Sequence, residues 1–449
     1  MRHNSSKIAF GWLLFGLGSQ LQLWGVSLSF TEFFSLVAGP VLFMTEYRRM
    51  KKTGVSFFFW VSILLVISAG LSCFVNHSPM YAVIRGMAVV CLMPCSIVVC
   101  HWLLRRNLGG FKWYLVGVAI SSVLCTFIFR RSVEVSMWAQ GVSDSETTAL
   151  IMSGPLFWIE RLGVFAVLPP KGWYMSCPLL LSAFLPLALS LFSIFTSTSG
   201  RSAALGAVAA CAIVLLGGKS QSSIKKRICK NIWLIGIIGI GVVLGFYGFY
   251  RLSATKGWLG EEAQEKYYSQ TRGGTGGIGA LLMGGRMDSF CGILACIDHP
   301  IVGVGPWPRG GGEYVAEFLN KYGTYEDAQR YVEMQESALR YGQSLGVPCH
   351  SHITMFWCWF GIGGLIFILY VLFVHIRYFC QDCWAIPQWF MWLAAGLPAF
   401  LWCVFFSPMT GRTGLALVSV AVLMARAVRR GRLRLPSYMI EEIIKHERK

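Results

Sequence analysis

The sequence has few charged residues, and acidic ones are especially scarce. Only 13% of the 449 residues are charged, and 21 acidic side chains face 39 basic ones. Soluble domains carry about 25% charged residues, so this deficit excludes an ordinary soluble globular protein. The longest polar segment also lacks a compact acidic cluster, because Asp288 and Asp298 stand apart. We therefore expect no metal site there.

Cysteine pairs with the spacing of metal ligands are also scarce. The chain's CxxC, at Cys380 and Cys383, has no second pair, which argues against a zinc site. Most of the 15 cysteines lie in apolar blocks and are expected to act as small hydrophobes. Cys291 and Cys296 lie in a polar segment and are candidates for pairing.

Long apolar blocks make up most of the chain. Apolar residues account for 55% of it, and the blocks are about 20 residues long, the length that crosses a hydrocarbon core. The pattern predicts an all-α, polytopic integral membrane protein with about 12 transmembrane helices. Eleven spans are expected at 8–27, 30–46, 55–74, 80–103, 111–130, 176–197, 200–217, 231–250, 351–376, 387–406 and 409–428. The first is interpreted as a retained span rather than a signal peptide.

Basic residues cluster in short segments between the apolar blocks, and the net charge is +18. Segments 46–52, 105–107, 219–230 and 425–436 are expected in the cytoplasm, because cytoplasmic loops are enriched in Lys and Arg. We therefore attribute the charge to membrane topology and expect membrane lipids, not nucleic acid, as partners. To place 219–230 inside, one more crossing is needed. Segment 148–170, which contains Glu160 and Arg161, is the candidate, as a span or a re-entrant segment.

This topology divides the chain into five parts and places the longest polar part outside the cytoplasm. Apolar residues recur at three- and four-residue spacing in 311–323 and 325–345, which predicts short helices within it. The parts are N-terminal helices in 1–175, helices including the Arg201 segment in 176–250, a periplasmic loop with short helices in 251–350, C-terminal helices in 351–428 and a cytoplasmic tail in 429–449.

Arg201, Arg286, His350 and His352 are all expected at the outer membrane level. Taken singly, an Arg at a span end usually reaches toward the interface, and a His there usually bonds to backbone or water. As a set, they suit a phosphate-bearing lipid. Arginine grips phosphate oxygens bidentately, and imidazole titrates near neutral pH. The glycines of "GVGPWPRGGG", among them Gly303 and Gly305, predict either a phosphate-binding loop or, more simply, a turn between helices.

Three segments resemble, in order, the core region of the O-antigen ligase and polymerase superfamily of bacterial inner-membrane glycosyltransferases. They are "TSTSGRSAALGAVAACAIVLL", "GGRMDSFCGILACIDHPIVGVGPW" and "HSHITMFWCWFGIGGLIF". Two departures stand out. Gly200 precedes Arg201 where Ser is commoner, although Ser199 is adjacent, and Ser351 replaces the usual Asn after His350. His350 lies eleven residues before Gly361, the first glycine of the Gly-x-x-Gly sequence, and this spacing favours His350 as the catalytic histidine. His352 is its competitor.

The resemblance implies a metal-independent, inverting glycosyltransferase without cofactors, whose active site faces the periplasm. Its donor would be a glycan on undecaprenyl pyrophosphate. His350 would activate the acceptor, while Arg201 and Arg286 would hold the pyrophosphate. Ser199, His352, Gly303 and Gly305 complete the expected substrate-binding set.

The acceptor distinguishes three activities within this family. We favour an O-antigen ligase acting on lipid A–core, because the outer loop is of moderate size and has no second domain for docking a protein. A polymerase acting on a growing glycan and a protein O-oligosaccharyltransferase are the alternatives. A transporter of the lipid-linked glycan is an alternative of another class. It would not need a histidine base.

Overall fold

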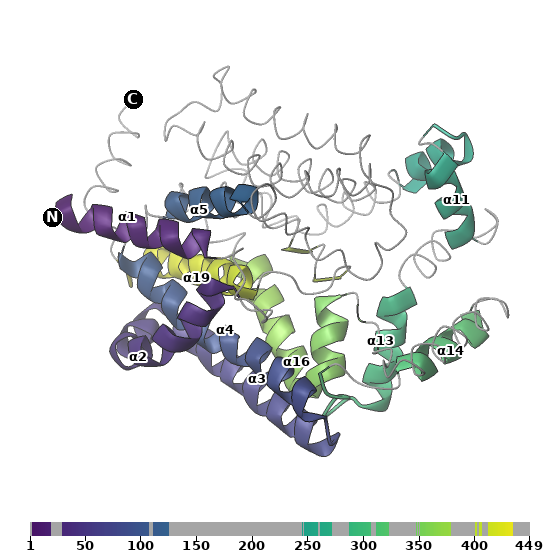
Figure 1. Cartoon of the computed structure of the whole chain (residues 1–449), viewed down its shortest axis with the longest axis horizontal. Coiled ribbons are helices and arrows are strands. Elements are labelled where there is room, and N and C mark those ends of the chain that lie inside the picture. Colours follow the sequence, from purple (N-terminus) through teal and green to yellow (C-terminus); the bar gives the residue numbers. More distant parts are fainter. Residues whose placement is uncertain are drawn as a thin grey trace.

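The structure is a computed structural model of the whole chain (Figure 1). It describes residues 2–18, 29–106, 111–124, 245, 247–258, 261–271, 287–306, 311–322, 347, 349, 351–378, 400–401, 404–405 and 412–433. The regular elements within these residues are helices, as expected for an all-α fold. The predicted number of about 12 spans is not tested, since segments such as 148–170 and 176–197 lie outside the described residues.

The described helices run in chain order from the N-terminal segment to the basic C-terminal region. They are α1 (Arg2–Leu17), α2 (Phe30–Thr53), α3 (Val55–Val75), α4 (Met80–Arg106), α5 (Phe111–Val123), α11 (Glu261–Gln270), α13 (Met287–Asp298), α14 (Gly311–Tyr322), α16 (His352–Phe373), the π-helical turn η4 (Val374–Tyr378) and α19 (Arg412–Arg429).

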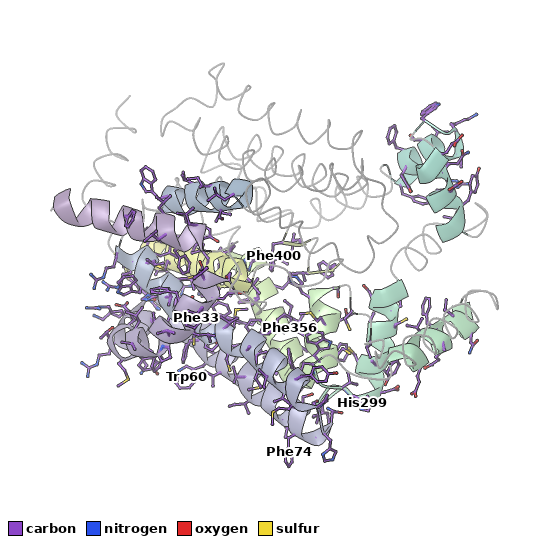
Figure 2. All side chains as sticks on the ribbon, viewed as in Figure 1. Phe33, Trp60, Phe74, His299, Phe356 and Phe400 are labelled. Atoms are coloured by element: carbon purple, nitrogen blue, oxygen red, sulfur yellow. The ribbon has the colours of Figure 1, made fainter. Side chains whose placement is uncertain are left out.

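By length and composition alone, three of these helical segments could cross a membrane: α3, α4 and α16 with η4, the last of which is interrupted at Gly361. Large apolar side chains are exposed in rows at three- and four-residue spacing, namely Phe30, Phe33, Phe34, Val37, Val41 and Met44 on α2, and Phe57, Trp60, Leu64, Ile67, Leu71, Phe74 and Val75 on α3. Figure 2 shows Trp60 and Phe74 on the outside of the ribbon. Such continuous apolar surface is rare on soluble proteins and indicates contact with lipid.

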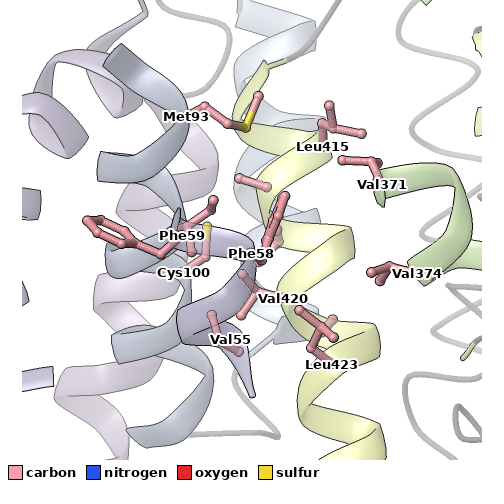
Figure 3. Packing of buried hydrophobic residues seen from close by; sticks show 14 of the residues in the cluster. Val55, Phe58, Phe59, Met93, Cys100, Val371, Val374, Leu415, Val420 and Leu423 are labelled. Atoms are coloured by element: carbon pink, nitrogen blue, oxygen red, sulfur yellow. The ribbon is translucent and has the colours of Figure 1, made fainter. Parts of the chain in front are cut away.

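The core is built from α3, α4, α16 and α19 (Figure 3). Helix α19 is buried almost all round, from Leu415 through Ala427, as expected of a helix in the interior of a bundle. Val420 and Leu423 face Val55 and Phe58 of α3, while Leu415 lies near Met93 of α4. Helices α3, α4 and α19 therefore share one apolar interior.

Helix α2 differs from its prediction because it continues through the basic segment 46–52 to Thr53. Its start and end are both fixed by local chemistry. Ser29 and Glu32 form a capping box, with Ser29 N–H donating to the Glu32 carboxylate at 2.8 Å and Glu32 N–H donating to Ser29 Oγ at 3.2 Å. Gly54 ends the helix in a left-handed conformation (φ 79°), which glycine adopts without steric cost.

The basic residues gather at one end of the bundle, which we call the basic end. They come from the last turns of α2, α4 and α19 and from η4: Lys51, Lys52, Arg105, Arg106, Arg377, Arg426, Arg429, Arg430 and Arg432. The Arg426 guanidinium lies 3.6 Å from the Tyr378 ring centroid, which joins α19 to η4. Segments 46–52, 105–106 and 425–433 thus share one end, as their charge predicts, while 219–230 is outside the described residues.

One buried carboxylate joins two of these helix ends. Glu46 of α2 accepts from Arg105 Nε at 3.0 Å and Arg105 Nη2 at 2.8 Å, and from Arg49 Nη1 at 2.9 Å. His101 Nδ1 lies 3.2 Å from the second Glu46 oxygen, and His101 Nε2 lies 3.1 Å from Thr53 Oγ1. The ion pairs therefore fasten α2 to α4 just where both helices become basic.

Candidate functional site at the break in helix α16

Helix α16 is not the single span expected over 351–376 but two helical arms folded against each other. The break is at Gly361, where φ is 61° and ψ is −148°. The rings of Phe356 and Phe367 lie 5.2 Å apart, whereas 11 residues of unbroken helix would separate them by about 16 Å. We call residues 352–360 the first arm and 362–373 the second arm. The apolar run before His375 is therefore a hairpin.

Three glycines make this hairpin possible. The conformation of Gly361 is open almost only to glycine, and a Cβ there would collide with the Ile301 carbonyl. A Cβ on Gly364 would meet the carbonyl oxygen of Phe356, so the two arms touch at that point. A Cβ on Gly363 would meet Ser68 Oγ, which brings the second arm against α3. The "GIGG" sequence thus provides the turn and two close approaches.

The segment after α13 fills the gap that the break leaves in the backbone hydrogen bonding. Val304 N–H donates to Cys358 O at 2.7 Å, and Gly305 N–H donates to Trp359 O at 3.2 Å. In return, Ile362 N–H donates to Ile301 O at 3.0 Å. Unpaired backbone groups are costly in an apolar setting, and broken helices persist there only where protein or water satisfies them. We call residues 300–306 together with 358–362 the tip.

Helix α3 holds the tip in place through its last turn. Ser72 Oγ donates to Trp359 O at 2.8 Å, and Asn76 Nδ2 donates to Gly303 O at 2.9 Å. Helix α3 begins at the basic end and has 21 residues, so the tip lies about 30 Å from the basic end. This is close to the thickness of a hydrocarbon core. The tip and the basic end are thus at opposite ends of the bundle.

Gly303 and Gly305 form a turn between helices and have left-handed φ values of 78° and 86°. Gly303 N–H donates to His299 O at 3.0 Å, and Gly305 N–H donates to Trp359 O. Both amides are therefore occupied within the protein, which matches the simpler of the two expectations for this segment. A role for these glycines in substrate binding stays a prediction.

Helix α13 and the first arm lead to the tip side by side in the same direction (Figure 1). Cys296 Sγ lies 3.7 Å from Thr354 O, and further along Trp357 Nε1 donates to Pro300 O at 3.1 Å. Their C-terminal ends meet at the tip, so their N-terminal ends, at Met287 and His352, both point away from it. The two helix N-termini therefore carry their partial positive charge toward the same side.

Ser351 and His352 form the start of the first arm. Ser351 is the N-cap, and its Oγ accepts from Thr354 N–H at 3.0 Å and lies 2.7 Å from Thr354 Oγ1. His352 is the first helical residue, and only 4% of it is exposed. It lies at the far end of a nine-residue arm, about 13 Å along the helix axis from the break. His352 thus lies deeper in the bundle than the tip.

The acidic residue at the end of α13 is held by a tyrosine of α14. Tyr314 hydrogen-bonds to Asp298, and burial together with the Asp298 charge raises the pKa of Tyr314 to about 12. The phenol therefore stays neutral and can donate to the carboxylate. Helix α14 also confirms the helix expected at 311–323, whereas the one expected at 325–345 lies outside the described residues.

The four other predicted site residues, Arg201, Ser199, Arg286 and His350, lie outside the described residues. Their roles stay predictions. The structure gives two residues roles that the sequence analysis did not assign, Ser351 as a helix cap and Asn76 as a residue that holds the tip. A Ser just before an apolar run is a known cap signal and could have identified Ser351. The bond from Asn76 to Gly303 spans 227 residues and has no local signal.

Comparison with known protein families and with characterised proteins gives no match to this chain.

Proposed function

We propose that this chain is a glycosyltransferase of the bacterial inner membrane that moves a glycan from undecaprenyl pyrophosphate to an acceptor hydroxyl at the periplasmic face. An O-antigen ligase acting on lipid A–core is the favoured form. The observation that carries the proposal is the parallel packing of α13 and the first arm of α16. Met287 and Ser351, where these elements begin, directly follow the predicted site residues Arg286 and His350.

The separation of the basic end from the tip supports the proposed orientation. Clustered Lys and Arg favour the cytoplasmic side. With the basic end inside, the tip lies about 30 Å away on the periplasmic side, after the 21 residues of α3. Lipid-linked glycans carry their sugar beyond the membrane and their phosphates at its surface. Because His352 lies about 13 Å deeper in the bundle than the tip, the donor would have to enter from the periplasmic side to reach a site at the N-terminal ends of α13 and the first arm.

The two helix N-termini support an anionic substrate. Helix N-termini favour phosphate, because their free N–H groups and partial positive charge point outward. Broken membrane helices use the same property to hold anionic groups at membrane depth. Arg286 directly precedes one such terminus and His350 lies just ahead of the other. Together with Arg201, they would supply the positive charge that a pyrophosphate requires.

The reaction follows from these groups. His350 takes the proton of the acceptor hydroxyl, and the oxygen attacks the anomeric carbon from the face opposite the pyrophosphate. A new glycosidic C–O bond forms while the bond to the pyrophosphate breaks, so the configuration inverts. Undecaprenyl pyrophosphate leaves with the bonding electron pair, stabilised by Arg201 and Arg286. The proton on His350 then passes to solvent.

The test is transfer by purified full-length protein, given an undecaprenyl-pyrophosphate glycan and, separately, lipid A–core, a glycan acceptor or a protein acceptor. We expect His350→Ala to lower the transfer rate by about 100-fold or more, as loss of a general base does. His352→Ala is the comparison variant: as a predicted substrate-binding residue, it should raise the KM for the donor but retain transfer at saturating donor. Full activity of the His350 variant would remove that residue from catalysis, and loss only in the His352 variant would reassign the base.

Chelation of divalent ions separates arginine from metal stabilisation of the leaving group. We expect transfer to be unchanged in EDTA, because guanidinium groups keep their charge without a metal. Loss of activity in EDTA with rescue by magnesium would contradict this mechanism.

The broken helix also favours a second candidate, a transporter of the lipid-linked glycan. Discontinuous helices line substrate sites in many transporters. Such a protein would move the labelled lipid across a liposome bilayer without forming a glycosidic bond. Translocation that survives His350→Ala, without transfer to any acceptor, would favour this candidate.

A further inference from the structure

Three cysteines meet beside the first arm of α16. Cys296 of α13 and Cys358 of the first arm are completely buried in one small apolar cluster, and Cys349 packs against it. The Cys296 and Cys349 thiols each lie within interaction range of the Cys358 thiol. All three are free cysteines. Residues from α13, from the approach to α16 and from α16 itself thus bring three thiols into one cluster.

The three thiols differ in their access to solvent. Cys349 is partly exposed, whereas Cys296 and Cys358 are not exposed at all. Thiolates, not thiols, attack disulfides. An external reagent would therefore meet Cys349 first.

Chain geometry also favours Cys349 over Cys296 as the partner of Cys358. A disulfide needs Cα atoms about 4.4–6.8 Å apart and a narrow range of dihedral angles. Cys349 lies outside regular helix, two residues before the N-cap Ser351, so its backbone can adjust. Cys296 lies within α13, which is held against the first arm through Pro300 and Ile301. Among the described residues, no group of three His, Cys, Asp or Glu side chains is arranged as metal ligands.

We propose that Cys349 and Cys358 form an exchangeable disulfide when the protein meets a small external disulfide such as oxidised glutathione. In the first step the Cys349 thiolate attacks the glutathione disulfide, which gives a mixed disulfide and releases one reduced glutathione. In the second step Cys358 attacks the Cys349 sulfur and releases the second. The two protein thiols are oxidised, one glutathione disulfide is reduced to two thiols, and the two thiol protons pass to the released glutathione.

The bond would tie the segment before α16 to the body of the first arm. That segment contains His350, so the disulfide would fix the approach to the predicted base. Any effect on glycan transfer rests on the proposed function, but the formation of the bond does not. Detection of the disulfide therefore tests this inference even if the chain transfers no glycan.

The test uses purified full-length protein in detergent, incubated with oxidised or reduced glutathione, alkylated, and digested without reduction for mass spectrometry. After oxidation we expect a peptide pair that joins Cys349 to Cys358. In Cys358→Ser, the second step is impossible, so Cys349 should carry one glutathione. Cys291→Ser is the control, because Cys291 is buried on the same helix α13 but belongs to another cluster. It should form the Cys349–Cys358 bond like the wild type.

Two results would overturn the proposal. One is a peptide pair joining Cys296 to Cys358, which would assign the bond to the wrong partner. The other is full alkylation of Cys349 after oxidation with no crosslink. Cys349→Ser provides a second variant at a partly exposed position, in case the Cys358 variant fails to fold. It should leave Cys358 reduced under the same conditions.

Discussion

At the scale of single residues, Glu46 shows how one side chain organises the basic end. Its side chain is 1% exposed, and it is surrounded by Arg49, Arg105 and His101. A buried carboxylate is tolerable only with such partners, because its desolvation would otherwise be severe. Arg105 makes the two-pronged contact that guanidinium and carboxylate geometry favours. The cluster therefore neutralises part of the charge where several helices end in basic residues.

Replacement of Glu46 by Gln should destabilise the protein. The change removes the charge from three short contacts and leaves two guanidiniums near a neutral group. We expect a loss of about 2–3 kcal/mol, since hydrogen bonds to charged groups contribute about 1.5–3 kcal/mol each and Arg49 is half exposed. The measurement is the melting temperature in detergent. The matched control is Glu261→Gln on exposed α11, which should leave it unchanged. If both variants have the melting temperature of the wild type, the cluster contributes little to stability.

The sequence could predict the charge of this segment but not the burial of Glu46. Locally, "EYRRMKK" indicates a basic cytoplasmic loop, and one acidic residue within it has no evident role. Its importance depends on Arg105, 59 residues away, and on the packing of α2 against α4. Ser351 is the opposite case, because its capping role depends on Thr354, only three residues on. Local chemistry can thus be predicted from the sequence, whereas long-range pairing depends on the packing of helices.

At the scale of elements, the starts and apolar faces of helices were predictable, but the hairpin in α16 was not. Apolar run length predicts that a segment is helical and in lipid, and α3 at Val55–Val75 lies within a residue of its expected bounds of 55–74. Run length carries no information on direction, however, so residues 351–376 give the pattern of one span. Only the glycines of "GIGG" indicate otherwise, and their meaning depends on Ile301 and Phe356.

Gly361→Ala should destabilise the hairpin, whereas Gly70→Ala should not. Alanine at Gly361 must adopt φ 61° and ψ −148°, and its Cβ would collide with Ile301. Backbone strain of this kind costs about 1–3 kcal/mol. Gly70 lies within α3, and a Cβ at that position would have no neighbouring atom within 4 Å, so alanine there is neutral or slightly stabilising. The measurement is thermal unfolding in detergent. A Gly361 variant as stable as the Gly70 variant would contradict the hairpin.

At the scale of the whole molecule, two properties together predict the orientation in the membrane. The basic residues come from segments that are far apart in sequence, yet the helices bring 46–52, 105–106 and 425–433 to one end. The tip, built from 300–306 and 358–362, is at the other end. Charge in the sequence predicted the first grouping, because the positive-inside pattern acts on each loop separately. The second grouping requires the fold, since it joins α3, the turn after α13 and α16.

This orientation predicts which lysines an impermeant reagent reaches from outside the cell. Lys256 is exposed and belongs to the predicted outer loop, so an amine-reactive label should modify it in intact spheroplasts. Lys51 and Lys52, exposed at the basic end, should be modified only after permeabilisation. His299→Lys adds an amine at an exposed position beside the tip, directly after α13, and should be labelled from outside, which extends the test to the tip. Labelled peptides are identified by mass spectrometry.

Labelling of Lys51 and Lys52 in intact spheroplasts, with Lys256 unlabelled, would show that the protein has the opposite orientation in the membrane. The tip, the first arm of α16 and the predicted transfer site would then face the cytoplasm, where the proposed donor does not present its glycan.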